Sequence, residues 1–544
     1  MIRTDDLLIV PVVLPLVTGA SLLFLSGDRH RNFKAAVNVA VVTALVGVAM
    51  ALLLSVSGAR PEGISEVYRL GDWPAPFGIV LVLDRLSALM LLLTSILALA
   101  AVVFSLARWH RAGAHFHSLF QFLLMGLNGA FLTGDLFNLF VFVELLLAAS
   151  YGLVLHGSGL ARVSAGLHYI VVNLAASLLF LIGVSLIYGV AGTLNMADLA
   201  ERIPSIAAEN RGLLEAGAGI LGIAFLLKAG MWPLCFWLPT TYAAASPPVA
   251  SVFAIMTKVG AYIVLRLSLL LFGAGAGTSA GFGGSVLLFG GLATIAFGAI
   301  GTLASQNMAR LTAFCVLVSS GTLLAATGLG QVGVTAGALF YLVSSTFGIG
   351  ALFLLVELVE RGREPGADMI AVTREAYAAA DDDADKEVEV GMAIPGTMGL
   401  LGLAFIGCAL VIIGLPPLSG FIAKFALLTA ALHPLGTPQG GAISAGSWAF
   451  VVVLILSGFA TLIAMTRAGI RALWASPDRA VPRVHVIEIA PVVLLLIICV
   501  VQTAQAGPIM RFMQATAQSL YAPADYVHGV LHRTDESARK AGSL

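Results

Sequence analysis

Long apolar stretches follow one another along almost the whole chain, and short polar or charged segments separate them. Most stretches reach about 18 residues or more, the length that an α-helix needs to cross a hydrocarbon core of about 30 Å. Proline, glycine and charged residues mark where one stretch ends and the next begins. The pattern predicts an all-α polytopic membrane protein with about fourteen transmembrane helices, at residues 7–25, 33–56, 79–106, 117–134, 136–156, 167–189, 217–242, 249–271, 284–304, 311–328, 334–359, 397–432, 447–468 and 487–507.

Two of the predicted helices, the seventh (217–242) and the twelfth (397–432), contain breaks. Pro233 interrupts the first, and the pair Pro416 and Pro417 interrupts the second. Proline removes a backbone hydrogen bond and kinks a helix, and unwound backbone at membrane depth is tolerated only against protein or a water-filled cavity. Proline kinks are common in membrane helices, so two could coincide by chance. Because a lysine stands beside each break, we favour a transporter built from inverted repeats.

Breaks at corresponding positions predict two inverted repeats of five helices each, helices 4–8 and helices 9–13. The first repeat covers residues 117–271 and the second covers 284–468. Helices 1–3 then occupy residues 1–110, and helix 14 with the C-terminal tail occupies 487–544. Three segments are predicted outside the membrane: an outer loop at 57–78 with a short hairpin, an inner loop at 361–395, and a tail after about residue 508 that begins as an amphipathic surface helix.

Basic residues are concentrated in every second loop. Because cytoplasmic loops are enriched in Lys and Arg, this distribution predicts both termini on the outer side of a bacterial inner membrane. The basic tail after helix 14 runs against this bias. The N-terminus lacks a basic segment, so we expect its first helix to be retained. The predicted inner residues are Arg29, Arg31, Lys34, Arg108, Arg111, Arg162, Arg310, Arg361, Arg363, Arg374, Lys386, Arg467, Arg471, Arg479 and Arg483, against Arg3, Arg60, Arg69, Arg202 and Arg211 outside.

Composition supports this class of protein and excludes others. Hydrophobic residues make up 59% of the chain and charged residues only 11%, whereas a soluble domain carries about 25% charged residues. A soluble enzyme is therefore excluded, and a net charge of zero argues against nucleic acid as a partner. We expect no metal site and no cofactor, because the cysteines stand singly in apolar segments, at Cys235, Cys315, Cys408 and Cys499.

Four charged residues stand near the middle of predicted membrane helices: Glu144, Lys228, Lys258 and Lys424. Each such charge costs about 2.5–3.5 kcal/mol or more at the bilayer centre. A static ion pair that fixes helix packing would explain one lysine, but one glutamate cannot neutralise three. Desolvation and neighbouring cations both disfavour the ammonium form, so at least one lysine should exchange its proton near neutral pH. We therefore predict that these four side chains relay protons.

Other polar residues are secondary candidates. Arg85 and Arg266 lie near helix ends, where their side chains can reach the interface and act as anchors. His168, near the start of helix six, titrates in a useful range, but its place near an inner-side helix end favours an interfacial polar residue slightly over a relay. In the second half, hydroxyl groups could support a chain of water molecules or serve only as packing contacts, at Ser319, Ser320, Tyr341, Ser344, Ser345 and Thr346.

Three segments carry a family resemblance: GDLFNLFVFVELLLAASYGL around Glu144, LKAGMWPLCFWLPTTYAAASPPVASVFAIMTKVGAY from Lys228 through Lys258, and GLPPLSGFIAKF around Lys424. They resemble the antiporter-like family, which contains large subunits of Mrp-type monovalent cation/proton antiporters and proton-pumping membrane subunits of respiratory complex I. The resemblance covers nearly the whole chain. Within the family, YGVAGTLNMADLA and YRLGDWPAPFGIVLVLD are most similar to the D-type Mrp subunits.

The resemblance implies a function and roles for matched positions. Glu144 and Lys228 resemble the coupled pair of the first half-channel, Lys258 the central connecting lysine, and Lys424 the terminal lysine of the second half. The chain would be a proton-translocating subunit of an antiporter that exchanges protons for Na+ or another monovalent cation. Its implied partners are A-, B-, C-, E-, F- and G-type subunits, and no cofactor is implied.

The chain departs from the family in helix eleven, where many relatives carry histidine and lysine and this chain has Tyr341, Ser345 and Ile349. Either water held by these hydroxyls bridges Lys258 to Lys424, or the proton path leaves elsewhere. Two other functions stay open. One is an N- or M-type pumping subunit of complex I or of a membrane-bound hydrogenase, and the other is a scaffold whose buried charges only organise packing.

Overall fold

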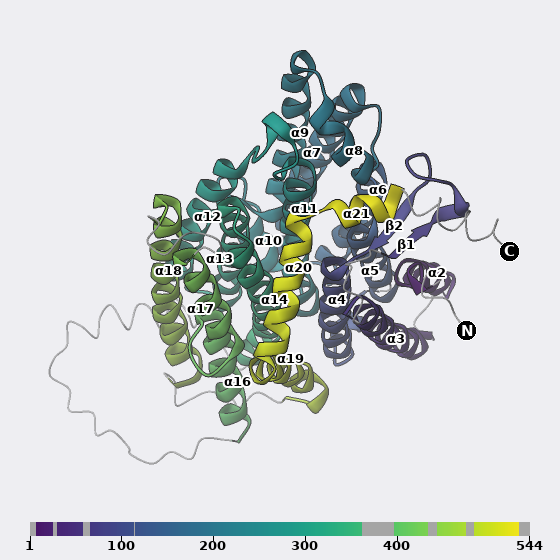
Figure 1. Cartoon of the computed structure of the whole chain (residues 1–544). Coiled ribbons are helices and arrows are strands. Elements are labelled where there is room, and N and C mark those ends of the chain that lie inside the picture. Colours follow the sequence, from purple (N-terminus) through teal and green to yellow (C-terminus); the bar gives the residue numbers. More distant parts are fainter. Residues whose placement is uncertain are drawn as a thin grey trace.

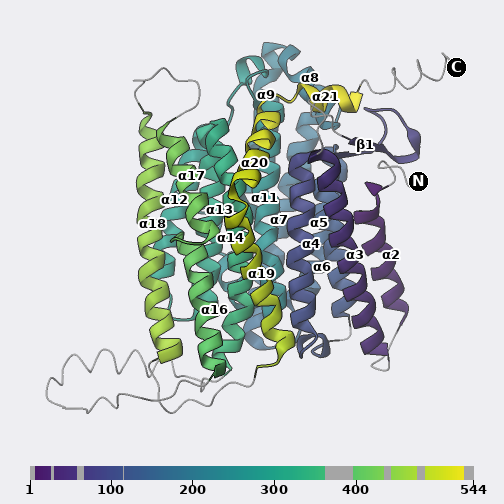
Figure 2. The same cartoon turned by 60° about the horizontal axis from the view of Figure 1, so that its bottom comes forward.

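The structure is a computed structural model that describes residues 7–25, 30–57, 66–113, 115–361, 396–433, 443–474 and 484–531. Its long helices run side by side in one bundle (Figure 1, Figure 2). They are α2 (Val10–Phe24), α3 (Arg31–Ser57), α4 (Arg85–Ser105), α5 (Phe116–Leu132), α6 (Leu136–Val154), α7 (Leu160–Ala191), α9 (Ala208–Ala229), α11 (Pro247–Phe272), α12 (Gly284–Ala304), α13 (Met308–Leu329), α14 (Val332–Glu360), α16 (Gly396–Ile413), α17 (Ser419–Leu432), α18 (Ala445–Gly469), α19 (Val486–Ala504) and α20 (Ala506–Tyr521). Some of them cover only part of the height of the bundle, such as α20, which continues from α19 (Figure 2).

Shorter elements connect these helices or lie at their ends. They are β1 (Glu66–Arg69), β2 (Val80–Leu83), α8 (Met196–Arg202), α10 (Leu238–Ala244) and α21 (Ala524–Leu531), the 3₁₀ turns η2 (Leu70–Asp72), η3 (Trp109–Arg111), η4 (Ile203–Ser205) and η5 (Gly277–Ser279), and the π turn η6 (Ile470–Trp474).

Each predicted span contains a helix. Twelve helices in the described ranges are long and apolar enough to cross a membrane, and α2, α5 and α17 are shorter apolar helices. An all-α polytopic membrane protein is thereby confirmed, while the count of fourteen crossings stays a prediction. Local side chains fix several helix starts: Asp84 caps α4 in a capping box with Ser87, and Asp135 caps α6. Such caps satisfy backbone N–H groups that a helix start leaves without partners.

Both predicted helix breaks are present. α9 ends at Ala229 and α10 starts only at Leu238, and a second break separates α16 from α17. At the end of each first half a glycine adopts the left-handed conformation, with φ of 72° at Gly230 and 81° at Gly414. Glycine takes this conformation without steric cost and ends a helix there. The division into inverted repeats at 117–271 and 284–468 stays a prediction.

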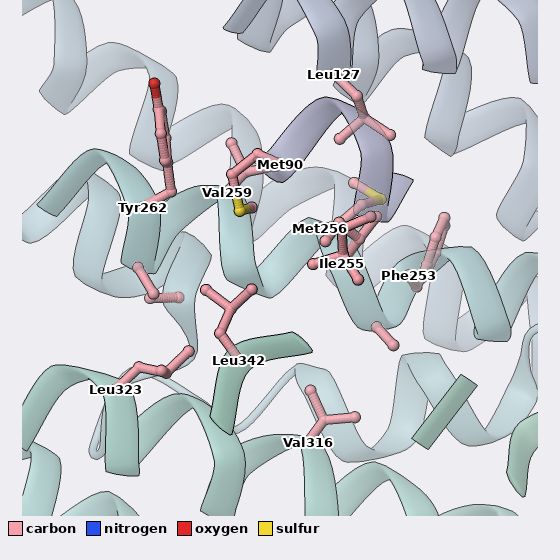
Figure 3. Close-up of a cluster of buried hydrophobic side chains, with 14 of the residues drawn as sticks. Met90, Leu127, Phe253, Ile255, Met256, Val259, Tyr262, Val316, Leu323 and Leu342 are labelled. Atoms are coloured by element: carbon pink, nitrogen blue, oxygen red, sulfur yellow. The ribbon is translucent and has the colours of Figure 1, made fainter. Parts of the chain in front are cut away.

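The centre of the bundle consists of α11, α13 and α14, which are buried along almost their whole length. Figure 3 shows apolar side chains of α11 beside side chains of α4, α5, α13 and α14. Polar groups in the middle of these three helices are enclosed by protein, so they have to find partners within it. The cluster includes Met90, Leu127, Phe253, Ile255, Met256, Val259, Tyr262, Val316, Leu323 and Leu342.

The predicted hairpin is present: β1 and β2 pair antiparallel with Glu66 opposite Leu83. The third helix therefore begins at Arg85, later than the predicted residue 79, because the strand and its cap occupy the start of that apolar stretch. The predicted inner loop at 361–395 lies outside the described residues, except for Arg361.

The prediction of a surface helix after residue 508 is wrong for α20. This helix continues upward from α19 and packs against α14, and α21 then lies against α8 and β1 (Figure 2). The apolar face of α20, with Met513, Ala517 and Leu520 buried, rests on protein. An amphipathic helix can rest its apolar face on a membrane surface or on another helix, so the sequence pattern did not distinguish the two. α2 begins at the end of the bundle where α21 lies (Figure 2).

Candidate functional site

Four different helices carry the charged residues that the sequence singles out. Glu144 lies on α6, Lys228 in the last turn of α9, Lys258 on α11 and Lys424 on α17. Lys258 is fully buried, and Lys228 and Lys424 are 9% and 8% exposed, whereas Glu144 is partly exposed on α6. The described residues include no cluster of three His, Cys, Asp or Glu side chains that could hold a metal ion.

Glu144 and Lys228 do not form a static ion pair. The hydroxyl of Ser177 on α7 donates a hydrogen bond to the Glu144 carboxylate. Lys228 Nζ is buried and has no hydrogen-bond partner among the described residues. A cavity of about 20 Å³ lies beside Lys228, lined also by Val143 and Asn173, and that volume holds about one water molecule. Sequence reasoning missed Ser177, because serine is an ordinary packing residue in membrane helices.

The break that follows Lys228 is held in place by neighbouring helices. The hydroxyl of Ser320 on α13 donates to the carbonyl of Ala229, the last residue of α9. The N–H of Trp232 donates to Thr294 Oγ1 of α12 at 2.8 Å. Backbone groups left unpaired at membrane depth would each cost several kcal/mol. These two bonds therefore make the break a defined structure, and they fix the end of α9 that positions Lys228.

Lys258 connects to the serines of the second half. Its Nζ donates to Ser319 Oγ on α13 at 2.7 Å, and Ser319 donates to Ser345 Oγ on α14 at 2.9 Å. Tyr341 lies beside Ser319, one helical turn before Ser345. The structure thus brings together Lys258 and the two hydroxyl residues proposed from the sequence in helix eleven.

Lys424 is held by the second break. Its Nζ donates to the carbonyl of Ile413, the last residue of α16, at 2.7 Å. A Cβ at Gly414 would lie 2.6 Å from Lys424 Cδ, so the lysine stem lies directly against this glycine. One residue before Ser345, Ser344 Oγ lies 2.8 Å from Ser419 Oγ at the start of α17. The hydrogen-bonded hydroxyls from Lys258 therefore end at Ser345, and Ser344 with Ser419 forms a separate pair at the helix of Lys424.

The three predicted helix-break residues lie where expected, whereas the predicted anchor Arg266 does not. Pro233, Pro416 and Pro417 all lie in the breaks. His168 is exposed on α7, and its ring is bonded to Ser164 O of the same helix at 2.9 Å, so the structure does not bring it to the lysines. Arg266 is not an interface anchor, because it is buried and lies 2.8 Å from Asp84.

Comparison with known proteins identifies the family. The family model described as "NADH:quinone oxidoreductase/Mrp antiporter, TM" matches residues 133–436, which contain all four charged residues. The chain belongs to this family. It is 62% identical to the D-type subunit of a probable K+/H+ antiporter from Rhizobium meliloti, over 99% of both chains. It is 31% identical to the D-type subunit of a Na+/H+ antiporter from Alkalihalophilus pseudofirmus, over 97% of this chain and 99% of that one.

A solved structure agrees with this assignment. A chain of the Mrp complex from Dietzia sp. DQ12-45-1b superposes with a TM-score of 0.82 and 26% identity, over 98% of this chain and 100% of that one. The family resemblance inferred from the three motif segments is confirmed, as is the expectation of a multi-pass membrane transporter subunit. The roles of the individual charged residues stay predictions.

Proposed function

We propose that this chain is the D-type, proton-translocating subunit of a multisubunit monovalent cation/proton antiporter, and that Glu144, Lys228, Lys258 and Lys424 carry its protons. One observation supports the relay above all: Lys228 is buried beside a cavity that fits about one water molecule and has no hydrogen-bond partner in the described part of the chain. A lysine kept only to fix packing would be expected to have its ammonium group satisfied.

Charge on Glu144 biases the protonation of Lys228. Two unit charges interact by about 4 kcal/mol at 4 Å and about 2 kcal/mol at 8 Å for an effective dielectric constant near 20. Since 1.4 kcal/mol changes an equilibrium about tenfold, either separation is sufficient to couple the two groups. A proton that reaches Glu144 removes this attraction and favours release of the proton from Lys228.

The second half of the relay uses hydroxyls where the charged residues are absent. A hydroxyl both donates and accepts, so a row of them can pass a proton along by exchanging bonds. Ser319 lies within hydrogen-bond distance of Lys258 and of Ser345, and Tyr341 lies next to Ser319. We assign to this group the step from Lys258 toward Lys424.

We propose K+ as the exchanged cation, because the relative with 62% identity is named for a K+/H+ antiporter, whereas the Na+/H+ relative is 31% identical. The subunit would act in a bacterial inner membrane with A-, B-, C-, E-, F- and G-type partners and both termini outside. The arrangement of basic loops supports this orientation. A pumping subunit of complex I is less supported, since the two relatives above that match nearly the whole chain are antiporter subunits.

The test uses the whole antiporter complex in everted membrane vesicles, with collapse of a pH gradient on addition of K+ or Na+ as the signal. Glu144→Gln, Lys228→Ala and Lys424→Ala are each expected to abolish exchange while the complex assembles normally. Lys34→Ala is the control, because Lys34 is also buried but lies on α3, which packs against α2, α4 and α5. Wild-type exchange in all three relay variants would refute the relay and leave the scaffold role.

A further inference from the structure

A large cavity, here called the vestibule, lies where α4 and α14 end and where α7 and α11 begin. Its volume is about 300 Å³, enough for several water molecules. Charged side chains line it, among them Arg108, Arg162, Glu357 and Arg361. Because such a lining is stable only when hydrated or paired, the vestibule is a place for water at the end of the bundle that carries the basic loops.

Ion pairs give the vestibule a fixed rim. Glu357 lies 3.3 Å from Arg108 and 2.9 Å from Arg361, and Arg361 also lies 2.5 Å from Glu488. Trp109 Nε1 donates to the second oxygen of Glu357 at 2.6 Å. These bonds connect the ends of α4 and α14 to the start of α19. Glu357 is thus fully engaged by cationic and N–H donors, so the rim itself is not a free cation-binding site.

Tyr242 joins the vestibule to the relay. This residue lies in α10, directly after the first break, and it lines both the vestibule and the small cavity beside Lys228. No other described residue lines both. Tyr242 is only 2% exposed, and its ring is packed among Trp237, Phe253 and Phe353 at centroid distances of 6.1, 5.4 and 6.4 Å. The ring is therefore a barrier that cannot move aside without disturbing an aromatic cluster.

We propose that the Tyr242 hydroxyl is the group through which Lys228 exchanges protons with water in the vestibule; this inference rests on the relay role of Lys228 proposed above. A hydrated proton in the vestibule passes to the phenolic oxygen while the phenolic O–H proton passes to the water beside Lys228. That water passes a proton on to the amine, which becomes an ammonium group. The phenol ends the step neutral, and rotation of its O–H bond restores the starting state. The aromatic ring blocks the flow of water, and the hydroxyl alone provides the connection.

The first test is Tyr242→Phe, which keeps the ring and removes the hydroxyl. In the assembled complex, the maximal exchange rate is expected to fall about tenfold or more, while the cation concentration for half-maximal exchange stays unchanged. Tyr521→Phe is the matched control, because the Tyr521 hydroxyl lies 3.1 Å from Thr335 on α14 and outside both cavities. A defect in packing alone would lower the amount of complex instead of the rate per complex.

The second test is independent of the hydroxyl. Ala309 lines the vestibule, and the four native cysteines are buried, so Ala309→Cys offers a new accessible thiol. A charged, membrane-impermeant thiol reagent is expected to label it from one side of the membrane only and to block exchange. If Lys228→Ala is inactive but Tyr242→Phe and labelled Ala309→Cys both exchange normally, the access route is refuted and the relay stands. If Lys228→Ala exchanges normally, the proposed function itself has failed.

Discussion

The buried ion pair between Asp84 and Arg266 should make a measurable contribution to stability. The two side chains are 18% and 7% exposed, with nitrogen and oxygen 2.8 Å apart. Arg266 also donates to the Tyr262 hydroxyl at 2.9 Å, and its guanidinium lies 5.5 Å from the ring centroid of Tyr526 in α21. Asp84→Asn would leave this guanidinium as a buried charge without its carboxylate. The hairpin, α11 and the C-terminal helix would then all be affected.

The expected magnitude follows from the surroundings. Removing one partner of a buried ion pair costs about 3–5 kcal/mol, since the remaining charge is uncompensated. Asp84 also caps α4 by accepting from Ser87 N at 2.8 Å. Asparagine caps helices about as well as aspartate, so Asp84→Asn isolates the charge, and Asp84→Ala should cost about 1 kcal/mol more for the lost cap. The double variant Asp84→Asn with Arg266→Gln has no buried charge left and should recover most of the loss.

The assay is the thermal midpoint of the fluorescently tagged complex, measured by size-exclusion chromatography after heating. Arg85→Gln is the control: it removes a neighbouring charge, and Arg85 forms no ion pair within the described ranges. The midpoint should fall clearly for Asp84→Asn and rise again in the double variant. Equal midpoints for Asp84→Asn and Arg85→Gln, or losses that simply add in the double variant, would show that the pair is not coupled.

Two further outcomes are expected from the packing. A Cβ at Gly260 would lie 2.6 Å from the Ala229 nitrogen, whereas nothing lies within 4 Å of one at Gly222. Gly260→Ala should therefore lower the free energy of unfolding by about 1–3 kcal/mol, and Gly222→Ala should leave it almost unchanged. Thermal midpoints of the two variants would show the difference. Burial lowers the pKa of His156 from 6.5, so the unfolded chain binds its proton first and stability falls as the pH drops below about 6.5. His156→Gln, which keeps a donor for Trp109 O, should lessen that fall between about pH 7.5 and 5.5; equal losses in both proteins would exclude His156 as a cause.

Features that depend on local chemistry could be predicted from the sequence. The helix breaks followed from prolines and glycines, whose backbone preferences hold in any surroundings. The central charges stood out because a charge in an apolar helix needs a compensating role. Lys258, Ser345 and Tyr341 therefore appeared in the sequence as candidates, and the structure places them together.

Features that depend on contacts distant in the sequence could not be predicted. Arg266 was expected to reach the interface, but its partner Asp84 is 182 positions away, and nothing in the sequence near Arg266 indicates the pairing. The sequence left the role of His168 open for another reason. α7 is apolar on most of its surface, so the sequence does not show which face is turned toward the lysines. The hydrogen bond from Ser177 of α7 to Glu144 could not be predicted for the same reason.

The three buried lysines differ in the groups that their ammonium nitrogens contact, and this difference determines how each lysine can exchange a proton. Lys258 donates to a hydroxyl, and a hydroxyl can also donate a hydrogen bond to the lysine once its amine is neutral. Lys424 donates to the Ile413 carbonyl, which can only accept. The carbonyl can hold the Lys424 ammonium but cannot pass a proton to it or from it. Transfer at Lys424 therefore requires water or a movement of the second break that separates the two groups. The first break needs no such movement. Its backbone is hydrogen-bonded to Thr294 and Ser320 instead of to the lysine, so the Lys228 ammonium group stays beside its cavity.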